Sequence, residues 1–161
     1  MIRIALVLFL IGTGPAVAQD LVYSNAASRD CVLAATTEGA RLDCIGASAN
    51  ACMTDTPGGQ TTVGMSSCLD RELTYWDNRL NRIYQRLRKQ ERTAGVEAEL
   101  QQMQRAWIAY RDAACTHEAA TWGGGTGSGP AYLGCLIELT ARQTLRLERY
   151  LWEGDREWMT R

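Results

Sequence analysis

The chain is poor in the residues from which metal centres and nucleic-acid surfaces are built. His117 is the only histidine among 161 residues and no Cys-x-x-Cys pair is present, so Cys115 and His117 together form an incomplete ligand set. Lys and Arg number 17 against 18 for Asp and Glu, which excludes the basic surface expected of a nucleic-acid-binding protein. We therefore expect no metal, no cofactor and no nucleic-acid partner.

No apolar run is long enough to cross a bilayer. The run from residue 4 to residue 11 is far shorter than the roughly 20 residues of a membrane-spanning helix, and no later run exceeds it. Arg3 precedes this run and Ala16-Val17-Ala18 follows it, which is the order of regions in a secretory signal peptide. We predict cleavage after Ala18 and a periplasmic or secreted protein without membrane attachment; an uncleaved N-terminal anchor is the alternative.

The sequence also lacks the sustained alternation of apolar and polar residues that marks strands, and it has no internal repeat. Apolar residues recur instead at helical spacing in three long stretches, and two shorter apolar pieces suit helices of at most two turns. These patterns predict an all-α fold, a disulfide-braced helical bundle with a long antiparallel helix hairpin, a third long helix and short N-terminal helices. The long helices are expected from Ser66 or Ser67 to about Arg92, from about Val96 to Ala119, and from Ser128 or Pro130 onward, with the short pieces at 31–37 and 44–53.

Three parts of the chain follow from these elements. Residues 1–18 are the expected signal peptide, residues 19–64 form a cysteine-containing N-terminal segment, and residues 65–155 form the helical domain. On the third long helix the predicted buried face comprises Leu133, Leu136, Ile137, Thr140, Thr144, Leu147 and Leu151.

The first two long helices, folded into a hairpin about residues 93–95, place Asp77 opposite Arg111. We hypothesise that these two residues form a partly buried ion pair, with Asn81 and Tyr110 as neighbouring partners. Below this polar layer the same register stacks three apolar pairs, which are Leu80 with Trp107, Tyr84 with Met103, and Leu87 with Leu100.

All six cysteines follow the expected signal peptide, and an even number in an exported chain indicates disulfides. Cys115 and Cys135 lie at the same end of the predicted bundle, so we favour a bridge between them that closes the loop connecting their helices. Cys68 lies at that end too and competes for either partner. The remaining cysteines are placed to fix the short N-terminal helices; they are Cys31, Cys44 and Cys52.

The glycine-rich segment 121–129 cannot hold a regular element. It carries one large aromatic residue on a cross-linked scaffold, which suits insertion into a groove of another protein; an ordinary helix connection is the alternative. His117, at the end of the preceding helix, is expected to be a solvated or capping residue. The predicted partner-binding residues are His117, Trp122, Gly123, Gly124, Gly125 and Ser128.

Acidic residues raise the question of paired catalytic carboxylates, as in glycoside hydrolysis. Charged residues on an exposed helix face are the commoner explanation, and the glycine run does not follow a strand as a phosphate-binding loop would. We expect the chain not to be an enzyme. The acidic residues considered are Asp70, Glu72, Asp77 and Glu118.

Three motifs occur in order: two lie on the expected long helices, and the third is the glycine-rich loop leading to Cys135. The helical motif residues are Asp77, Leu80, Asn81, Tyr84, Leu87, Gln104, Trp107, Tyr110, Arg111, Asp112 and Cys115. With these motifs the chain from Cys68 to Leu147 resembles the LprI-like lysozyme-inhibitor domain family, which comprises small exported bacterial proteins. The resemblance implies a binding protein that blocks the cleft of lysozyme or a related muramidase.

Two features depart from the family pattern. Thr140 is followed three residues later by Gln143 where members often carry arginine, and Arg142 stands one place early. The segment that holds Cys31, Cys44 and Cys52 is also richer in cysteine than the commoner four-cysteine pattern. The alternative function is a disulfide-braced periplasmic module that binds another envelope protein or a small ligand.

Overall fold

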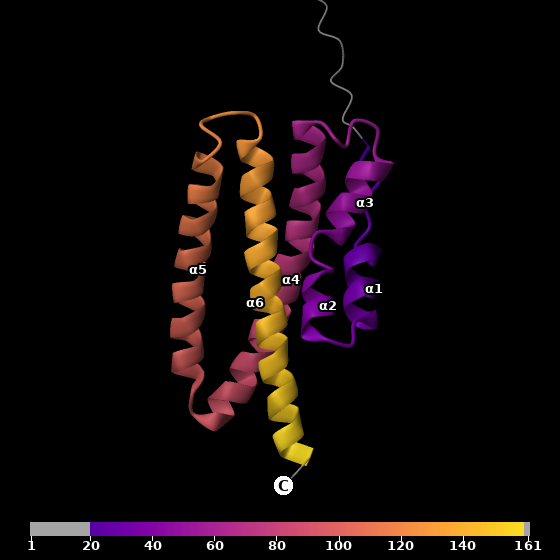
Figure 1. Cartoon of the computed structure of the whole chain (residues 1–161). Helices are drawn as coiled ribbons and strands as arrows, with labels where there is room; N and C mark the ends of the chain where they lie inside the picture. The colour runs from indigo at the N-terminus through magenta and orange to yellow at the C-terminus, as the bar shows by residue number, and fades with distance from the viewer. Residues whose placement is uncertain (1–19, 160–161) are drawn as a thin grey trace, which may run out of the picture.

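The computed structural model describes residues 20–159, so the expected signal peptide and its cleavage site lie outside the described residues. This part of the chain holds six helices and no strand. The predicted all-α bundle, with a long helix hairpin, a third long helix and short N-terminal helices, is confirmed (Figure 1). The helices are α1 (Ala26–Ala34), α2 (Glu38–Leu42), α3 (Ala47–Asp55), α4 (Thr62–Ala94), α5 (Glu97–Ala120) and α6 (Ser128–Met159). Within the described range, none of them has the combination of length and apolarity needed to cross a membrane.

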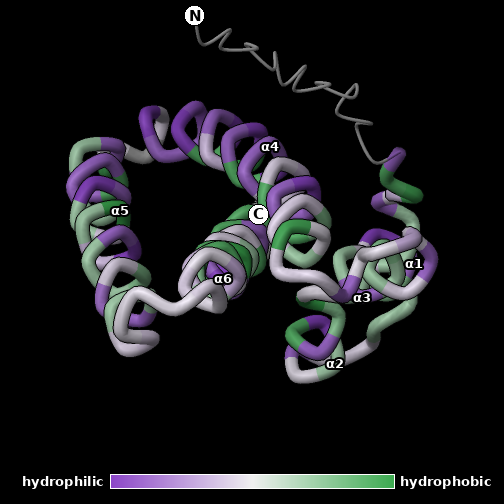
Figure 2. The backbone as a smooth tube through the Cα atoms, turned by 90° about the horizontal axis from the view of Figure 1, so that it is seen from above, coloured by the Kyte–Doolittle hydropathy of each residue, from purple (hydrophilic) through white to green (hydrophobic). Residues whose placement is uncertain are grey.

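The third long helix, α6, lies between the two arms of the hairpin. Figures 1 and 2 show α4 and α5 meeting at the turn near Gly95 and diverging toward the other end, with α6 packed against both. Gly95 ends α4 with φ of 80°, a left-handed conformation that glycine adopts without strain. The two arms therefore share a core with α6 rather than a continuous seam of their own.

The buried residues of α6 include most of the face predicted to be buried, and further residues outside that face are buried too. Because α6 has neighbours on both sides, Ala141, Gln143 and Leu145 are buried as well. The helix thus contributes to two core clusters, one with the N-terminal helices and one within the hairpin. Of the predicted positions, Leu136, Ile137, Thr140, Thr144 and Leu147 are buried, and Leu133 and Leu151 are half-buried.

The apolar layers predicted for the hairpin gather in one cluster. Leu80, Leu87 and Leu100 are buried around the fully buried Leu147 of α6. The partly buried side chains packed against them include Tyr84, Met103 and Trp107.

Helix α4 begins four residues before the expected Ser66. Thr61 is its N-cap, and its hydroxyl oxygen accepts a hydrogen bond of 3.1 Å from the backbone N–H of Gly64. Gly64 lies so close to Gly58 that an added Cβ would sit 2.3 Å from its carbonyl oxygen. Ser66 instead donates its hydroxyl to the carbonyl of Thr62 inside the helix, which is the other common use of a serine near a helix start.

The short N-terminal helices are fixed by two disulfides. Cys31 of α1 is bonded to Cys44, which follows α2, and Cys52 of α3 is bonded to Cys68 of α4. Cys68 is therefore unavailable to the loop cysteines, and the competing pairing considered from the sequence is wrong. The predicted role of the first three cysteines, to hold these helices in place, is confirmed.

An ion cluster holds the hairpin turn. Glu97, in the first turn of α5, accepts hydrogen bonds from the guanidinium groups of Arg92 and Arg88, with the shortest distance 2.7 Å from Arg88 Nη2. The hydrogen bonds from Arg92 and then Arg88 lower the pKa of Glu97 from 4.5 to about 2.

The pKa of Glu97 makes the contribution of this cluster depend on pH. A depressed carboxyl pKa stabilises the fold fully above the unfolded value near 4.5, and this contribution is lost as pH falls toward 2. We expect the melting temperature of Glu97→Gln to be lower than that of the unmodified protein at neutral pH, with the gap closing across this window. Thermal melts at several pH values measure the gap, and Glu99→Gln, an exposed acid in the same turn, is the control. A gap that is constant with pH would contradict this role for Glu97.

Candidate functional site

The loop 121–127 between α5 and α6 is closed at its base by a disulfide. Cys115 and Cys135 are bonded with their Cα atoms 5.4 Å apart, which confirms the pairing favoured from the sequence. Figure 1 shows the loop projecting at the end of the bundle remote from the hairpin turn. The cross-link therefore holds the two helix ends together directly beneath the loop.

The loop backbone forms successive tight turns. The N–H of Gly125 donates to the carbonyl of Trp122 at 2.9 Å, and the N–H of Ser128 donates to the carbonyl of Gly125 at 3.0 Å. Gly123 and Gly124 have φ values of 57° and 79°, in the left-handed region that disfavours side chains. Glycine is thus required for the path of this loop.

Trp122 is the dominant side chain of the loop. Its indole ring lies directly on the backbone of Gly127, where an added Cβ would sit 2.4 Å from ring atoms Cε3 and Cζ3. The side chain nevertheless remains 53% exposed. The ring is therefore supported on one side and open to a partner elsewhere.

The loop also carries hydrogen-bond donors without partners. Within the described residues, the backbone N–H groups of Gly124, Thr126 and Gly127 make no hydrogen bond, and neither does the hydroxyl of Ser128. No acidic residue occurs between 121 and 129. The loop thus combines an exposed aromatic ring with free donors and no negative charge.

His117 lies where the sequence placed it, in the last turn of α5, and is exposed. Its carbonyl accepts the N–H of Thr121 at 3.2 Å, so the residue adjoins the loop. Its imidazole has no hydrogen-bond partner among the residues that the structure describes.

The expected ion pair between Asp77 and Arg111 does not form in the described chain. Arg111 bonds Asp112 through Nε and Nη2 at 2.9 and 2.8 Å and stacks on Trp107, with 5.1 Å from Cζ to the ring centroid. Asp77 accepts a hydrogen bond of 3.1 Å from Asn81, as predicted, whereas Tyr110 is 60% exposed and is no partner. The ion pair does not form because α6 lies between α4 and α5 and holds these two helices apart where Asp77 and Arg111 stand.

Asp77 and Arg111 instead line opposite sides of a groove of about 310 Å³. Leu136 of α6 lines the same groove, as expected if α6 separates the arms. The prediction that Asp77 and Arg111 lie in one region is therefore correct, but the predicted ion pair between them is wrong.

Gln143, which stands where family members often carry arginine, is buried in the bundle. Its Nε2 donates to Oε1 of Gln104 at 3.0 Å, joining α6 to the motif on α5. Arg142 points outward and pairs with Glu138. A neutral amide pair thus bridges the two helices at this position.

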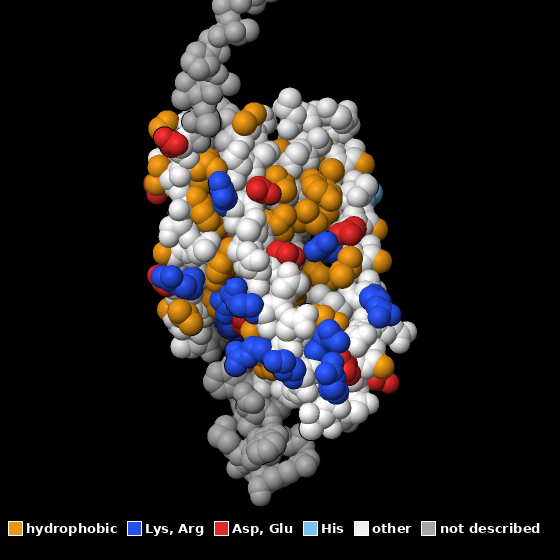
Figure 3. Space-filling model, turned by 180° about the vertical axis from the view of Figure 1, so that it is seen from behind, with side chains coloured by type: hydrophobic (Ala, Val, Ile, Leu, Met, Phe, Trp, Pro, Cys, Tyr) orange, Lys and Arg blue, Asp and Glu red, His pale blue; other side chains and the backbone are white. Residues whose placement is uncertain are grey.

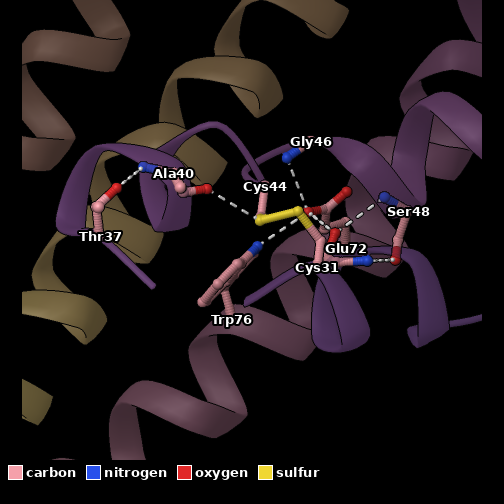
Figure 4. Close-up of a disulfide and its surroundings, with 9 residues drawn as sticks. Cys31, Thr37, Ala40, Cys44, Gly46, Ser48, Glu72 and Trp76 are labelled. Carbon is pink, nitrogen blue, oxygen red and sulfur yellow. Dashed lines mark hydrogen bonds between the residues drawn. A yellow bond between two sulfur atoms is a disulfide. The ribbon is translucent and has the colours of Figure 1, made fainter. Parts of the chain in front are cut away.

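Among the four candidate carboxylates, Glu72 has a structural role. It is fully buried, and its Oε1 accepts hydrogen bonds from Ser28 Oγ, Gly46 N and Trp76 Nε1 at 2.7 to 2.9 Å. Its Oε2 accepts the N–H of Ala49 at 2.6 Å. Figure 4 shows the Glu72 carboxyl group with the donors of Gly46 and Trp76 directed at it. One carboxyl group of α4 therefore holds α1, α3 and the turn before α3.

The other candidate carboxylates do not join Glu72. Asp70 and Glu118 are exposed, and Asp77 bonds Asn81. Within the described residues no group of three or more His, Cys, Asp and Glu side chains is arranged to hold a metal ion.

Sequence reasoning missed Glu148, which is 7% exposed on α6. Its carboxyl group bonds Arg41 of α2 and, at 2.6 Å, Arg79 of α4. The spacing of the sequence could have indicated its burial, because Glu148 continues the four-residue spacing of Thr140 and Thr144 along the predicted buried face. An acid on a buried stripe predicts a cationic partner from a neighbouring element.

Comparison with known proteins places these features in a family. Searches of curated proteins and of solved structures gave no match. The family described as lysozyme inhibitor LprI matches residues 52–147, more than half of the chain. The matched range contains both motif helices, the loop and two of the three disulfides. The chain therefore belongs to the lysozyme inhibitor LprI family.

Proposed function

We propose that the mature protein is an exported inhibitor that blocks the cleft of lysozyme or a related muramidase with the loop between α5 and α6. Family membership supports the general function. The three disulfides support export, because such bonds persist in oxidising compartments such as the periplasm. Inhibition by occupation of a cleft needs no catalytic group, so we propose that the chain is not an enzyme.

The observation that carries this proposal is the exposed Trp122 ring supported on Gly127, in a loop that also holds unpaired donors. Glycoside hydrolases of this type place two carboxyl groups at the bottom of a cleft. The free N–H groups of Gly124, Thr126 and Gly127 can donate to such oxygens, and no acid in the loop opposes them. A rigid aromatic anchor surrounded by polar contacts is the usual arrangement of residues that dominate binding energy.

The remaining predicted contacts support the same surface. Ser128 adds a free hydroxyl at the start of α6, and His117 adds an exposed imidazole beside the loop. Gly123 and Gly125 shape the loop rather than contact a partner through side chains. We propose that His117, Ser128 and the loop form one contact surface.

Trp122→Ala is expected to raise the concentration needed for half-inhibition by roughly thirtyfold, because a central aromatic anchor contributes about 2 kcal/mol or more to binding. A lysozyme cell-wall clearing assay measures this concentration. Trp122 is half-exposed, so the melting temperature should stay near that of the unmodified protein.

Tyr110→Ala is the matched control, since Tyr110 is an equally exposed aromatic on α5 away from the loop. Its inhibition should equal that of the unmodified protein. Undiminished clearing at large molar excess of the unmodified protein would refute lysozyme inhibition itself. Equal inhibition by the Trp122→Ala variant would refute only the assignment to the loop.

A further inference from the structure

A second groove lies far from the loop, between α1, α2, α4 and α6. Its volume is about 880 Å³, and we call it the arginine groove. Glu148 and the loop end are about 30 Å apart along α6, at 1.5 Å per residue from Ser128. Figure 3 shows Lys and Arg side chains gathering on the lower half of the rear face. The groove is lined by Arg41, Arg79, Arg82, Arg86 and Glu148, and by Val32, Leu33, Ala35, Ile83 and Leu151.

Among the described residues, Glu148 is the one acid that lines the groove, and it is fully engaged. Its Oε1 accepts from Arg79 Nε at 2.6 Å, and its Oε2 accepts from Arg41 Nη2. Arg79 also donates to the hydroxyl of Tyr75 at 2.9 Å. Burial is the largest single influence on the pKa of Arg79 and lowers it, but the hydrogen bonds and negative charge that Glu148 and Tyr75 supply together outweigh burial and raise this pKa. One carboxylate therefore faces two guanidinium groups.

Arg82 and Arg86 add uncompensated positive charge. Both are exposed on α4, and neither has an ion-pair or hydrogen-bond partner among the described residues. They stand four residues apart, so their like charges lie side by side on one helix face and repel each other. The groove thus carries an excess of positive charge in a chain whose net charge is −1. An external anion would relieve this repulsion.

The groove also has an apolar side. Leu33 of α1 is 73% exposed, and Ile83 of α4 and Leu151 of α6, which line the same groove, are half-buried. Ligand pockets of roughly 300 to 1,000 Å³ typically combine apolar walls with a few charged groups that fix the ligand. Guanidinium groups bind carboxylate and phosphate oxygens in a forked geometry.

From this combination we infer that the arginine groove binds a single-chain anionic amphiphile. Its carboxylate or phosphate head lies between Arg82 and Arg86, and its aliphatic chain lies along Leu33 and Ile83. This binding is separate from lysozyme inhibition, since it uses neither the loop nor its neighbours. It gives the protein a second, small-molecule partner.

Isothermal titration calorimetry with dodecyl phosphate, kept below its micelle concentration, tests the inference. We expect one site per chain. The double variant Arg82→Gln and Arg86→Gln should weaken binding roughly a hundredfold, about tenfold for each guanidinium group removed. The control is the double variant Arg105→Gln and Arg142→Gln, two exposed arginines outside the groove, which should bind as the unmodified protein does.

Further titrations test whether binding needs both the anionic head and the aliphatic chain. Leu33→Ser should weaken dodecyl phosphate and leave any binding of inorganic phosphate unchanged, and its exposure predicts an unchanged melting temperature. If inorganic phosphate binds as tightly as dodecyl phosphate, the groove is a simple anion site. If dodecyl maltoside binds as tightly as dodecyl phosphate, the groove is a simple apolar patch. Either result overturns the inference. Binding to phosphatidylglycerol vesicles without binding to dodecyl phosphate would overturn it in favour of a membrane surface. Loss of lysozyme inhibition in the Arg82 and Arg86 variant would contradict the separation of the two sites.

Discussion

Glu72→Ala is expected to lower the free energy of unfolding by at least about 3 kcal/mol, because it leaves buried donors without an acceptor at roughly 1 to 3 kcal/mol each. Four donors lose their acceptor together, and three of them belong to α1, α3 and the turn before α3. The short helices have little stability of their own. We therefore expect the N-terminal helices to loosen from α4 in this variant. Urea denaturation followed by circular dichroism measures the change.

Glu72→Gln refines the test. The amide keeps one oxygen acceptor but presents N–H groups to the backbone N–H of Ala49, so we expect a smaller loss than in Glu72→Ala. Asp70→Ala is the control, because Asp70 is an exposed acid half a turn away on the same helix. Equal stability of the Glu72 and Asp70 variants would show that the hydrogen bonds of Glu72 do not hold the helices.

Replacing both Cys115 and Cys135 by alanine is expected to cost about 3 kcal/mol of stability in the chain-entropy account, from a sequence separation of 20. It should also weaken lysozyme inhibition, because the ends of α5 and α6 would no longer hold the loop in one conformation and binding would bear the cost of ordering it. Denaturant unfolding and the clearing assay measure the two effects.

The matched control is the replacement of Cys31 and Cys44 by alanine. This bridge has a separation of 13, so its removal should destabilise the protein to a similar degree. It lies among α1 and α2 rather than at the loop, and inhibition should persist at temperatures where the variant is folded. A parallel loss of inhibition in both variants would show that overall stability, and not loop closure, controls the activity.

The sequence predicted the long helices well because their buried residues recur at helical spacing. It did not predict that α6 would separate the hairpin arms, because periodicity shows which face is buried and not which helix covers it. The hypothesis for Asp77 and Arg111 assumed direct contact between the arms. Arg111 instead takes the adjacent Asp112 and the Trp107 ring.

The burial of acidic side chains among the helices was the main structural feature that the sequence analysis did not predict. Glu72 stands in a four-residue series with Cys68, Trp76 and Leu80, all buried on one stripe of α4. Its donors come mostly from separate short helices and the turn between them, two of them as backbone N–H groups. The stripe was predictable from the sequence, but those donors were not, because they depend on how the short helices pack.

The loop was predicted as irregular, and the Cys115 to Cys135 bridge was predicted from the shared end of two helices. The support of Trp122 by Gly127 was not predictable, because it depends on the turn geometry at Gly123 and Gly124. The other two bridges depend on the packing of short helices whose positions the sequence does not set.

Competition for the lysozyme cleft is the most direct test of the proposed mechanism. The dissociation constant of the mature protein for lysozyme would be measured by titration calorimetry at rising concentrations of an N-acetylglucosamine oligosaccharide that fills the cleft. Occupation of the cleft by the loop predicts that the apparent dissociation constant rises in proportion to the oligosaccharide concentration once the cleft is saturated. A dissociation constant that does not change with oligosaccharide, or the absence of binding, would contradict the account.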